Sequence, residues 1–201
     1  MKFQKLLLAI GITLLSSQLE AQVYRSAFGF ETVISDNWVI VSRETVQANP
    51  ELLNVETTEM EGFDRPLKSK VQQMAMSGQF ELLYYRKSDA DFHDNTSLFI
   101  SNPAPTDFVL ALNALCQNLQ PQLQQAYNRS DFTSVHSCEH TNIALVDMLA
   151  YAFDGAFIGS RSYGYIFNTQ AGTVTMTVTC KLVKCQEVKT DAERFFLEIK
   201  M

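Results

Sequence analysis

Four cysteines and three histidines are the side chains of this chain best suited to chemistry. His136, Cys138 and His140 alternate along one expected strand, so their side chains are expected on one face. A thiolate and two imidazoles at this spacing could bind Zn²⁺ or copper. The alternative is a disulfide at Cys138 flanked by two surface histidines. The choice depends on the compartment in which the chain folds.

The first 21 residues have the layout of a secretory signal peptide. Two lysines precede an apolar run over residues 6–15, and a polar stretch then ends at Ala21. The run is shorter than the roughly 20 residues that a membrane-spanning helix needs. We expect cleavage after Ala21 and an exported domain over residues 22–201, periplasmic in a Gram-negative bacterium and otherwise secreted. No cysteine follows the cut, so no lipid anchor is expected. No later segment is apolar enough for a transmembrane helix, so membrane insertion of the mature chain is not expected either.

Export favours disulfides over metal ligation, because oxidising compartments turn paired cysteines into crosslinks. Buried free cysteines are the alternative. Cys116 lies on an expected helix and Cys138 on the next strand, and the rises of helix and strand place them at similar heights if the two elements pack antiparallel. We therefore expect the disulfide Cys116–Cys138 and, by remainder, Cys180–Cys185 with a turn between its two residues. With the cysteines crosslinked, no metal and no cofactor is expected.

The sequence gives only weak evidence for other metal-binding or catalytic motifs. His93 lies in an acidic loop over residues 89–94 that could hold Ca²⁺, but the loop lacks the glycine and the spacing of a calcium-binding loop. We therefore expect a solvated loop. The sequence has no Gly-x-Ser-x-Gly elbow, no His-Glu-x-x-His pair and no Walker loop, so it indicates no catalytic residue.

Three aromatic residues, Tyr163, Tyr165 and Phe167, alternate along another expected strand and share one face. They could form an exposed aromatic strip that binds a partner. The alternative is that helices cover this face and that the three rings belong to the core.

The charge balance excludes some partners. Loss of Lys2, Lys5 and Glu20 with the leader leaves 14 basic and 21 acidic side chains, a net charge of about −7. Nucleic-acid binding needs grouped Lys and Arg, and the sequence has no basic cluster. The same balance disfavours anionic membrane surfaces. A protein partner is expected, and a nucleic-acid partner is not.

The order of elements predicts one α+β domain. Before the middle of the chain we expect strands around a turn at Asp36-Asn37 and over 80–85 and 97–100, and helices from Pro50 and over 66–77. A longer helix over 106–127 follows, with a kink or break at Pro121. Four strand-like segments with short connections then indicate an antiparallel meander, at 132–139, 142–153, 156–168 and 172–180. Thr190 and Glu193 form a capping-box pattern that predicts a closing helix over 190–201. Helices on both faces of an antiparallel sheet make an α/β/α sandwich.

Three segments carry a resemblance to a known family: Phe28-Gly-Phe through Ser35-Asp-Asn-Trp38, Asp94 to Ile100, and the meander from Ala150 to Cys180. In this order they resemble the exported proteins of the PsbP-like (PsbP/DcrB-like) family. The resemblance covers most of the mature chain and implies a single PsbP-like domain. It also implies a binding or assembly role, because members of this fold are mostly modules of that kind.

We therefore expect an exported, non-catalytic binding or assembly module of the cell envelope. Two alternatives stay open. One is an immunity or inhibitor protein that blocks a toxin in the same compartment. The other is an enzyme whose active site is not visible in a single sequence.

Overall fold

The computed structural model describes residues 21–49, 65–88, 93–101, 108–126, 135–154 and 159–201. The expected leader up to residue 20, the helix expected from Pro50 and the loop 89–92 lie outside the described residues. The strands are β1 (Ala21–Ser26), β2 (Phe30–Ser35), β3 (Trp38–Val41), β4 (Phe80–Tyr85), β5 (Asn95–Ser101), β6 (Val135–Ile143), β7 (Val146–Asp154), β8 (Ser160–Asn168) and β9 (Thr173–Lys181). The helices are α1 (Arg43–Ala48), α2 (Arg65–Ser77), α3 (Phe108–Ala126) and α4 (Cys185–Glu193), and a 3-10 helix, η3 (Arg194–Phe196), follows α4.

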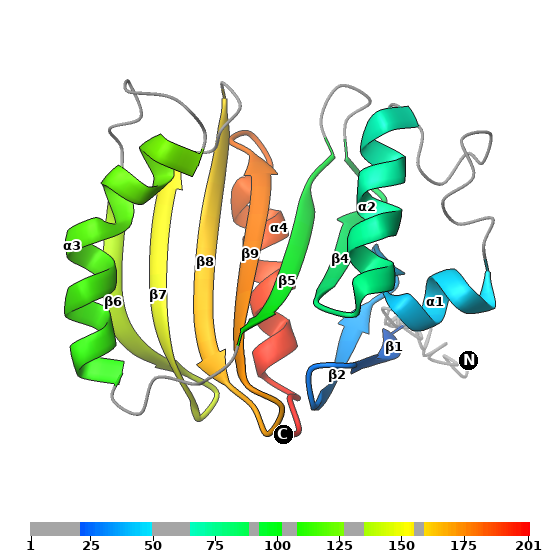
Figure 1. Cartoon of the computed structure of the whole chain (residues 1–201), viewed down its shortest axis with the longest axis horizontal. Coiled ribbons are helices and arrows are strands. Elements are labelled where there is room, and N and C mark those ends of the chain that lie inside the picture. The colour runs from blue at the N-terminus through cyan, green and yellow to red at the C-terminus, as the bar shows by residue number, and fades with distance from the viewer. Residues whose placement is uncertain (1–20, 50–64, 89–92, 102–107, 127–134, 155–158) are drawn as a thin grey trace, which may run out of the picture.

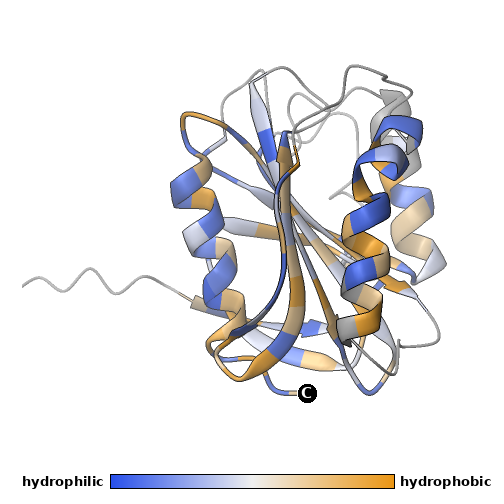
Figure 2. Ribbon diagram, turned by 90° about the vertical axis from the view of Figure 1, so that its left-hand side faces the viewer, coloured by the Kyte–Doolittle hydropathy of each residue, from blue (hydrophilic) through white to orange (hydrophobic). Residues whose placement is uncertain are grey.

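Seven strands form one antiparallel sheet in the order β3-β4-β5-β9-β8-β7-β6. Strands β6 to β9 form the meander that the short connections predict. Helices α2 and α3 lie on one face of this sheet and α4 lies on the other, as the two views show (Figures 1 and 2). The expected α+β class and α/β/α layering are therefore confirmed. We call the two faces the α3 face and the α4 face.

The core lies mainly on the α4 face. Strand β9 alternates as the sequence predicts: Val174, Met176 and Val178 are fully buried there, while its threonines point to the α3 face. Phe195 and Phe196 of η3 cover these residues and belong to the same apolar cluster. A second apolar cluster lies on the other face, where α1 and α2 cover β3 and β4.

The first two strands form a separate hairpin, β1–β2, which packs against η3 and α4. The sequence predicts strands on both sides of the Asp36-Asn37 turn, and β2 and β3 occupy those places, but they belong to different sheets. Strand β1 was not predicted. A buried carboxylate joins this hairpin to the main sheet, because Glu81 of β4 accepts hydrogen bonds from the hydroxyls of Tyr24 and Ser26 and from the Ala27 N–H.

One helix prediction needs correction. The closing helix begins at Cys185 rather than at Thr190, and it gives way to a 3-10 turn after Glu193. The disulfide at Cys185 fixes the turn before α4, so the apparent capping box lies inside the helix. Helix α3 continues through Pro121 without a break and changes direction in its C-terminal part (Figure 1). A proline can be accommodated in this way when the helix bends.

The β6–β7 hairpin has a strained two-residue turn. Ala144 and Leu145 have φ angles of 50° and 72°, in the left-handed region that a type I′ turn requires and that Asn-Gly fills best. Leu145 is also 93% exposed. Replacing the pair by Asn-Gly is expected to raise the free energy of unfolding by about 1 kcal/mol, because non-glycine residues pay roughly 1–2 kcal/mol in this conformation.

Urea titration of the A144N/L145G variant would measure this gain. Val183→Gly is the control, since Val183 lies in another turn and has no positive φ. It should leave stability unchanged or lower it. A fall in stability for A144N/L145G would contradict the assignment of strain to this turn.

Candidate binding surface

Part of the α4 face is left open beside α4. Strands β6, β7 and β8 present one row of side chains there, in which Glu139 lies opposite Ala150, and Ala150 lies opposite Tyr165. The next row joins Ser137, Ala152 and Tyr163 in the same way. The small side chains on β7 leave a hollow of about 350 Å³ between the taller neighbours.

Helix α4 forms one wall of this hollow with Lys189 and Glu193. The Glu193 carboxylate accepts a hydrogen bond from the Tyr165 hydroxyl at 2.8 Å and pairs with the Lys189 ammonium at 2.9 Å. The same ammonium lies 5.3 Å from the centre of the Tyr163 ring. The hollow therefore already stabilises one cation through a carboxylate and an aromatic face.

These groups favour binding over proton transfer. Burial, and then the charge of Glu193, raise the pKa of the Tyr165 hydroxyl well above its ordinary value. Tyr165 is thus a fixed hydrogen-bond donor near neutral pH and a poor base. Glu139 lies opposite α4 on strand β6, is exposed, and supplies a second carboxylate.

The raised tyrosine pKa predicts a loss of stability in alkali. The unfolded chain releases the Tyr165 proton near pH 10.0, while the folded chain keeps it. The stabilisation is therefore complete below pH 10 and is lost as the pH rises further. Burial raises the pKa values of Tyr24 and Tyr85 as well, so all three tyrosines contribute to the loss of stability in alkali. The urea concentration at the unfolding midpoint should therefore fall less steeply between pH 9 and pH 11 for Tyr165→Phe than for the wild type. Equal falls in the two proteins would contradict the role given to the Tyr165 hydroxyl.

The expected aromatic strip is wrong as an exposed surface. Tyr163, Tyr165 and Phe167 do share the α4 face, but Phe167 is 0% exposed and packs between the rings of Phe30 and Phe196. Tyr165 is also buried and packs against Phe196. The β1–β2 hairpin and η3 cover this end of the strip, so Tyr165 and Phe167 belong to the core, as in the alternative interpretation, although part of the cover is a hairpin and not a helix. Tyr163 is half-buried, and with Tyr165 it lines the hollow.

Both disulfides have the pairing expected from the sequence. Cys116 of α3 is bonded to Cys138 of β6, and Cys180 of β9 to Cys185 of α4. The second pair spans the turn that its spacing required. Because Cys138 is crosslinked, it cannot act as a thiolate ligand.

The two histidines beside Cys138 do not share a face, contrary to the expected alternation. A β-bulge between Val135 and Ser137 turns His136 toward Asp154, with 2.7 Å between Nε2 and Oδ1. His140 instead contacts Asp147, at 2.6 Å. Among the residues that the structure describes, no three side chains of metal-binding type gather closely enough to hold an ion.

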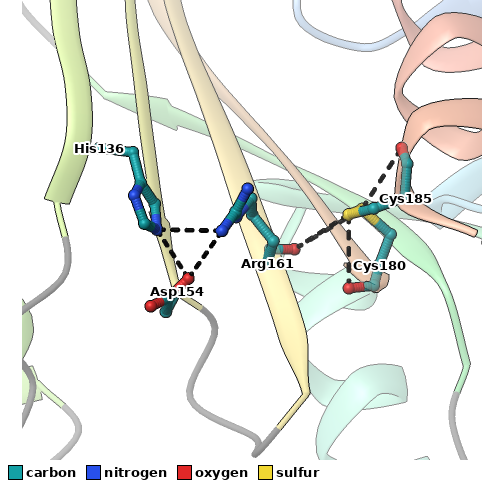
Figure 3. A network of polar contacts seen from close by, with 5 residues as sticks. All are labelled: His136, Asp154, Arg161, Cys180 and Cys185. Atoms are coloured by element: carbon teal, nitrogen blue, oxygen red, sulfur yellow. Dashed lines mark hydrogen bonds and ion pairs between the residues drawn. A yellow bond between two sulfur atoms is a disulfide. The ribbon is translucent and has the colours of Figure 1, made fainter. Parts of the chain in front are cut away.

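His136, Asp154 and Arg161 form a polar cluster in the row beyond the hollow (Figure 3). The Asp154 carboxylate accepts a hydrogen bond from His136, and one from the Arg161 guanidinium at 3.2 Å. The carbonyl oxygen of Arg161 lies 3.6 and 3.9 Å from the sulfurs of Cys180 and Cys185. This cluster connects the edge of the hollow to the start of α4. His93 lies at the edge of the described loop, and the expected solvated loop beyond it is outside the described residues.

Sequence reasoning missed the residues that shape the hollow. Ala150 and Ala152 alternate on β7, and Lys189 and Glu193 have the i,i+4 spacing of a helical ion pair. Both patterns can be read from the sequence. Neither pattern indicates that α4 lies beside β8, and that packing is what forms the hollow.

No protein-family model matches the chain, and no curated protein matches its sequence. A solved structure does match: the solution structure of cyanobacterial PsbP (CyanoP) from Synechocystis sp. PCC 6803. The TM-score is 0.54 at 13% sequence identity, and the match covers 98% of each chain. The chain has the PsbP-like fold. The expected PsbP-like resemblance is therefore confirmed at the level of the fold. None of the described helices is long and apolar enough to cross a bilayer.

Proposed function

We propose that this chain is an exported binding or assembly module of the cell envelope, and that its hollow on the α4 face receives a cation-bearing segment of a partner protein. The leader pattern and the two disulfides support an oxidising compartment outside the cytoplasm. The PsbP-like fold supports a binding role by analogy.

The observation that carries the proposal is the composition of the hollow. It combines two carboxylates, Glu139 and Glu193, with the ring of Tyr163 and a floor of alanines. The position of Lys189 between Glu193 and Tyr163 shows that an ammonium fits these groups. A lysine or arginine of a partner would meet the second carboxylate, Glu139, on the open side.

Affinity capture tests the proposal. The mature protein is used as bait in an envelope extract, beside Ala150→Phe, which fills the hollow from the floor. A partner should be enriched on the wild type about tenfold or more over Ala150→Phe, since truncating or blocking a central contact commonly costs over 1 kcal/mol. A matched variant on the α3 face, Asn113→Phe, should capture the partner normally, because Asn113 is an exposed residue of α3.

Two results would contradict the proposal. One is capture of nothing above background by the wild type. The other is equal capture by the wild type and by a folded Ala150→Phe. Cleavage after Ala21 stays a prediction, and the intact mass of the exported protein checks it.

A further inference from the structure

The turn between β9 and α4 lies at one end of the sheet (Figure 1) and contains two adjacent exposed aliphatic residues. Val183 is 81% exposed and Leu182 is 47% exposed. Lys181 and Lys184 flank them in the chain. We call these four residues the tip. Adjacent exposed aliphatic residues are costly to a soluble surface, so their arrangement calls for a physical explanation.

The tip is held rigidly. The Cys180–Cys185 disulfide closes it at the base, and both cysteines are buried. The Lys181 N–H donates to the buried Asp94 carboxylate at 2.7 Å, and the Leu182 N–H donates to the Gly159 carbonyl at 2.8 Å. These contacts fix the backbone of the turn that carries the aliphatic pair. A preorganised tip loses little conformational entropy when it binds.

Cationic side chains surround the tip. The Lys184 ammonium donates to the carbonyl of Lys87 at 3.0 Å, which places the end of β4 beside the tip. Arg86 and Lys87 are exposed there. Among the described residues at this end of the sheet, the acids near these four cations include Asp36, next to the Asn37 carbonyl that accepts from the Arg86 N–H, the exposed Glu187 in the first turn of α4, and the buried Asp94.

We propose that the tip is a lipid-contact site, in which Leu182 and Val183 enter the interfacial layer of a bilayer while the flanking lysines stay at the phosphate level. Two aliphatic side chains are too small an area for a specific protein interface, which usually buries more than about 1,200 Å². A bilayer needs no matching surface, because lipid surrounds whatever enters it. The acidic net charge of the whole chain repels an anionic membrane at longer range, where salt screens it, whereas the residues of the tip touch the lipid directly.

Vesicle flotation tests this proposal with the mature protein and vesicles of phosphatidylethanolamine and phosphatidylglycerol in a 3:1 ratio. The wild type should float with the vesicles. The L182S/V183S variant should bind about tenfold or more weakly, because both apolar side chains are lost. Leu145→Ser is the control: Leu145 is equally apolar and more exposed, lies in the β6–β7 turn, and should not change binding.

A fluorescence readout guards against misfolding of the variant. The chain has a single tryptophan, Trp38, which is buried. In the W38F/V183W variant, vesicles should shift the emission to the blue if the tip enters lipid. The proposal is overturned if the wild type does not float, or if L182S/V183S floats equally well. Ala150→Phe should bind vesicles normally, so this test is independent of the hollow.

Discussion

Glu81→Ala is expected to lower the free energy of unfolding by on the order of 2–4 kcal/mol, because the buried Tyr24 hydroxyl and two partly buried donors lose their acceptor at once. The Glu81 side chain is 2% exposed and receives hydrogen bonds from Tyr24, Ser26 and Ala27. These contacts join the β1–β2 hairpin to the main sheet. Without them the hairpin would have to leave the buried Tyr24 hydroxyl unpaired, or detach.

A double-mutant cycle with Tyr24→Phe measures this coupling. In the Tyr24→Phe background, loss of Glu81 leaves one fewer unpaired donor, so its cost should be smaller by about 1 kcal/mol or more. Glu31→Ala is the matched control, since Glu31 lies on the same hairpin and pairs with Arg25 at the surface. It should cost less than about 1 kcal/mol. A loss for Glu81→Ala no larger than the loss for Glu31→Ala would refute the structural role of the buried carboxylate.

Removing the Cys116–Cys138 disulfide is the second large effect, expected at about 3 kcal/mol from the entropy of a closed loop of this length. The two cysteines are 22 residues apart, and they join α3 to β6. Of the α3 side chains that the structure describes, Leu119 is buried and Leu115 and Leu123 are half-buried, so the disulfide adds a covalent link to their apolar contact. The helix also contains Pro121, which removes one backbone hydrogen bond.

Urea unfolding and amide hydrogen exchange of the C116A/C138A variant check this prediction. Exchange should become faster in α3 while β8 and β9 stay protected, because local opening follows the loss of local contacts. The C180A/C185A variant, with a separation of 5 residues, is the comparison, and the loop-entropy model gives it a smaller loss of about 2 kcal/mol. Unchanged protection of α3 in C116A/C138A would show that packing, and not the disulfide, holds this helix.

The meander could be predicted because its pattern is local. The alternation of valines and threonines in β9 follows directly from one buried and one polar face. Strand β1 was missed because Tyr24 is its one buried residue and the strand begins where the expected leader ends. The start of α4 was missed because the disulfide at Cys185, a tertiary constraint, decides where that helix begins.

The candidate site was predictable in its parts but not as a whole. Tyr163, Tyr165 and Phe167 were singled out as sharing one face, and that placement is correct. The burial of Tyr165 and Phe167 depends on η3 and on the β1–β2 hairpin, which lie far apart in the sequence. The position of His136 depends on a single β-bulge that adds one residue to β6. Such irregularities leave no periodic signal.

The most direct test of binding through the hollow is photocrosslinking in intact cells. A benzophenone amino acid replaces Ser137, an exposed residue at the rim of the hollow, and in a parallel strain replaces Asn113 on α3. The proposed role predicts a discrete crosslinked product from position 137 that disappears with Ala150→Phe and is absent from position 113. No product from position 137, or one that persists when Ala150→Phe fills the hollow, would contradict it.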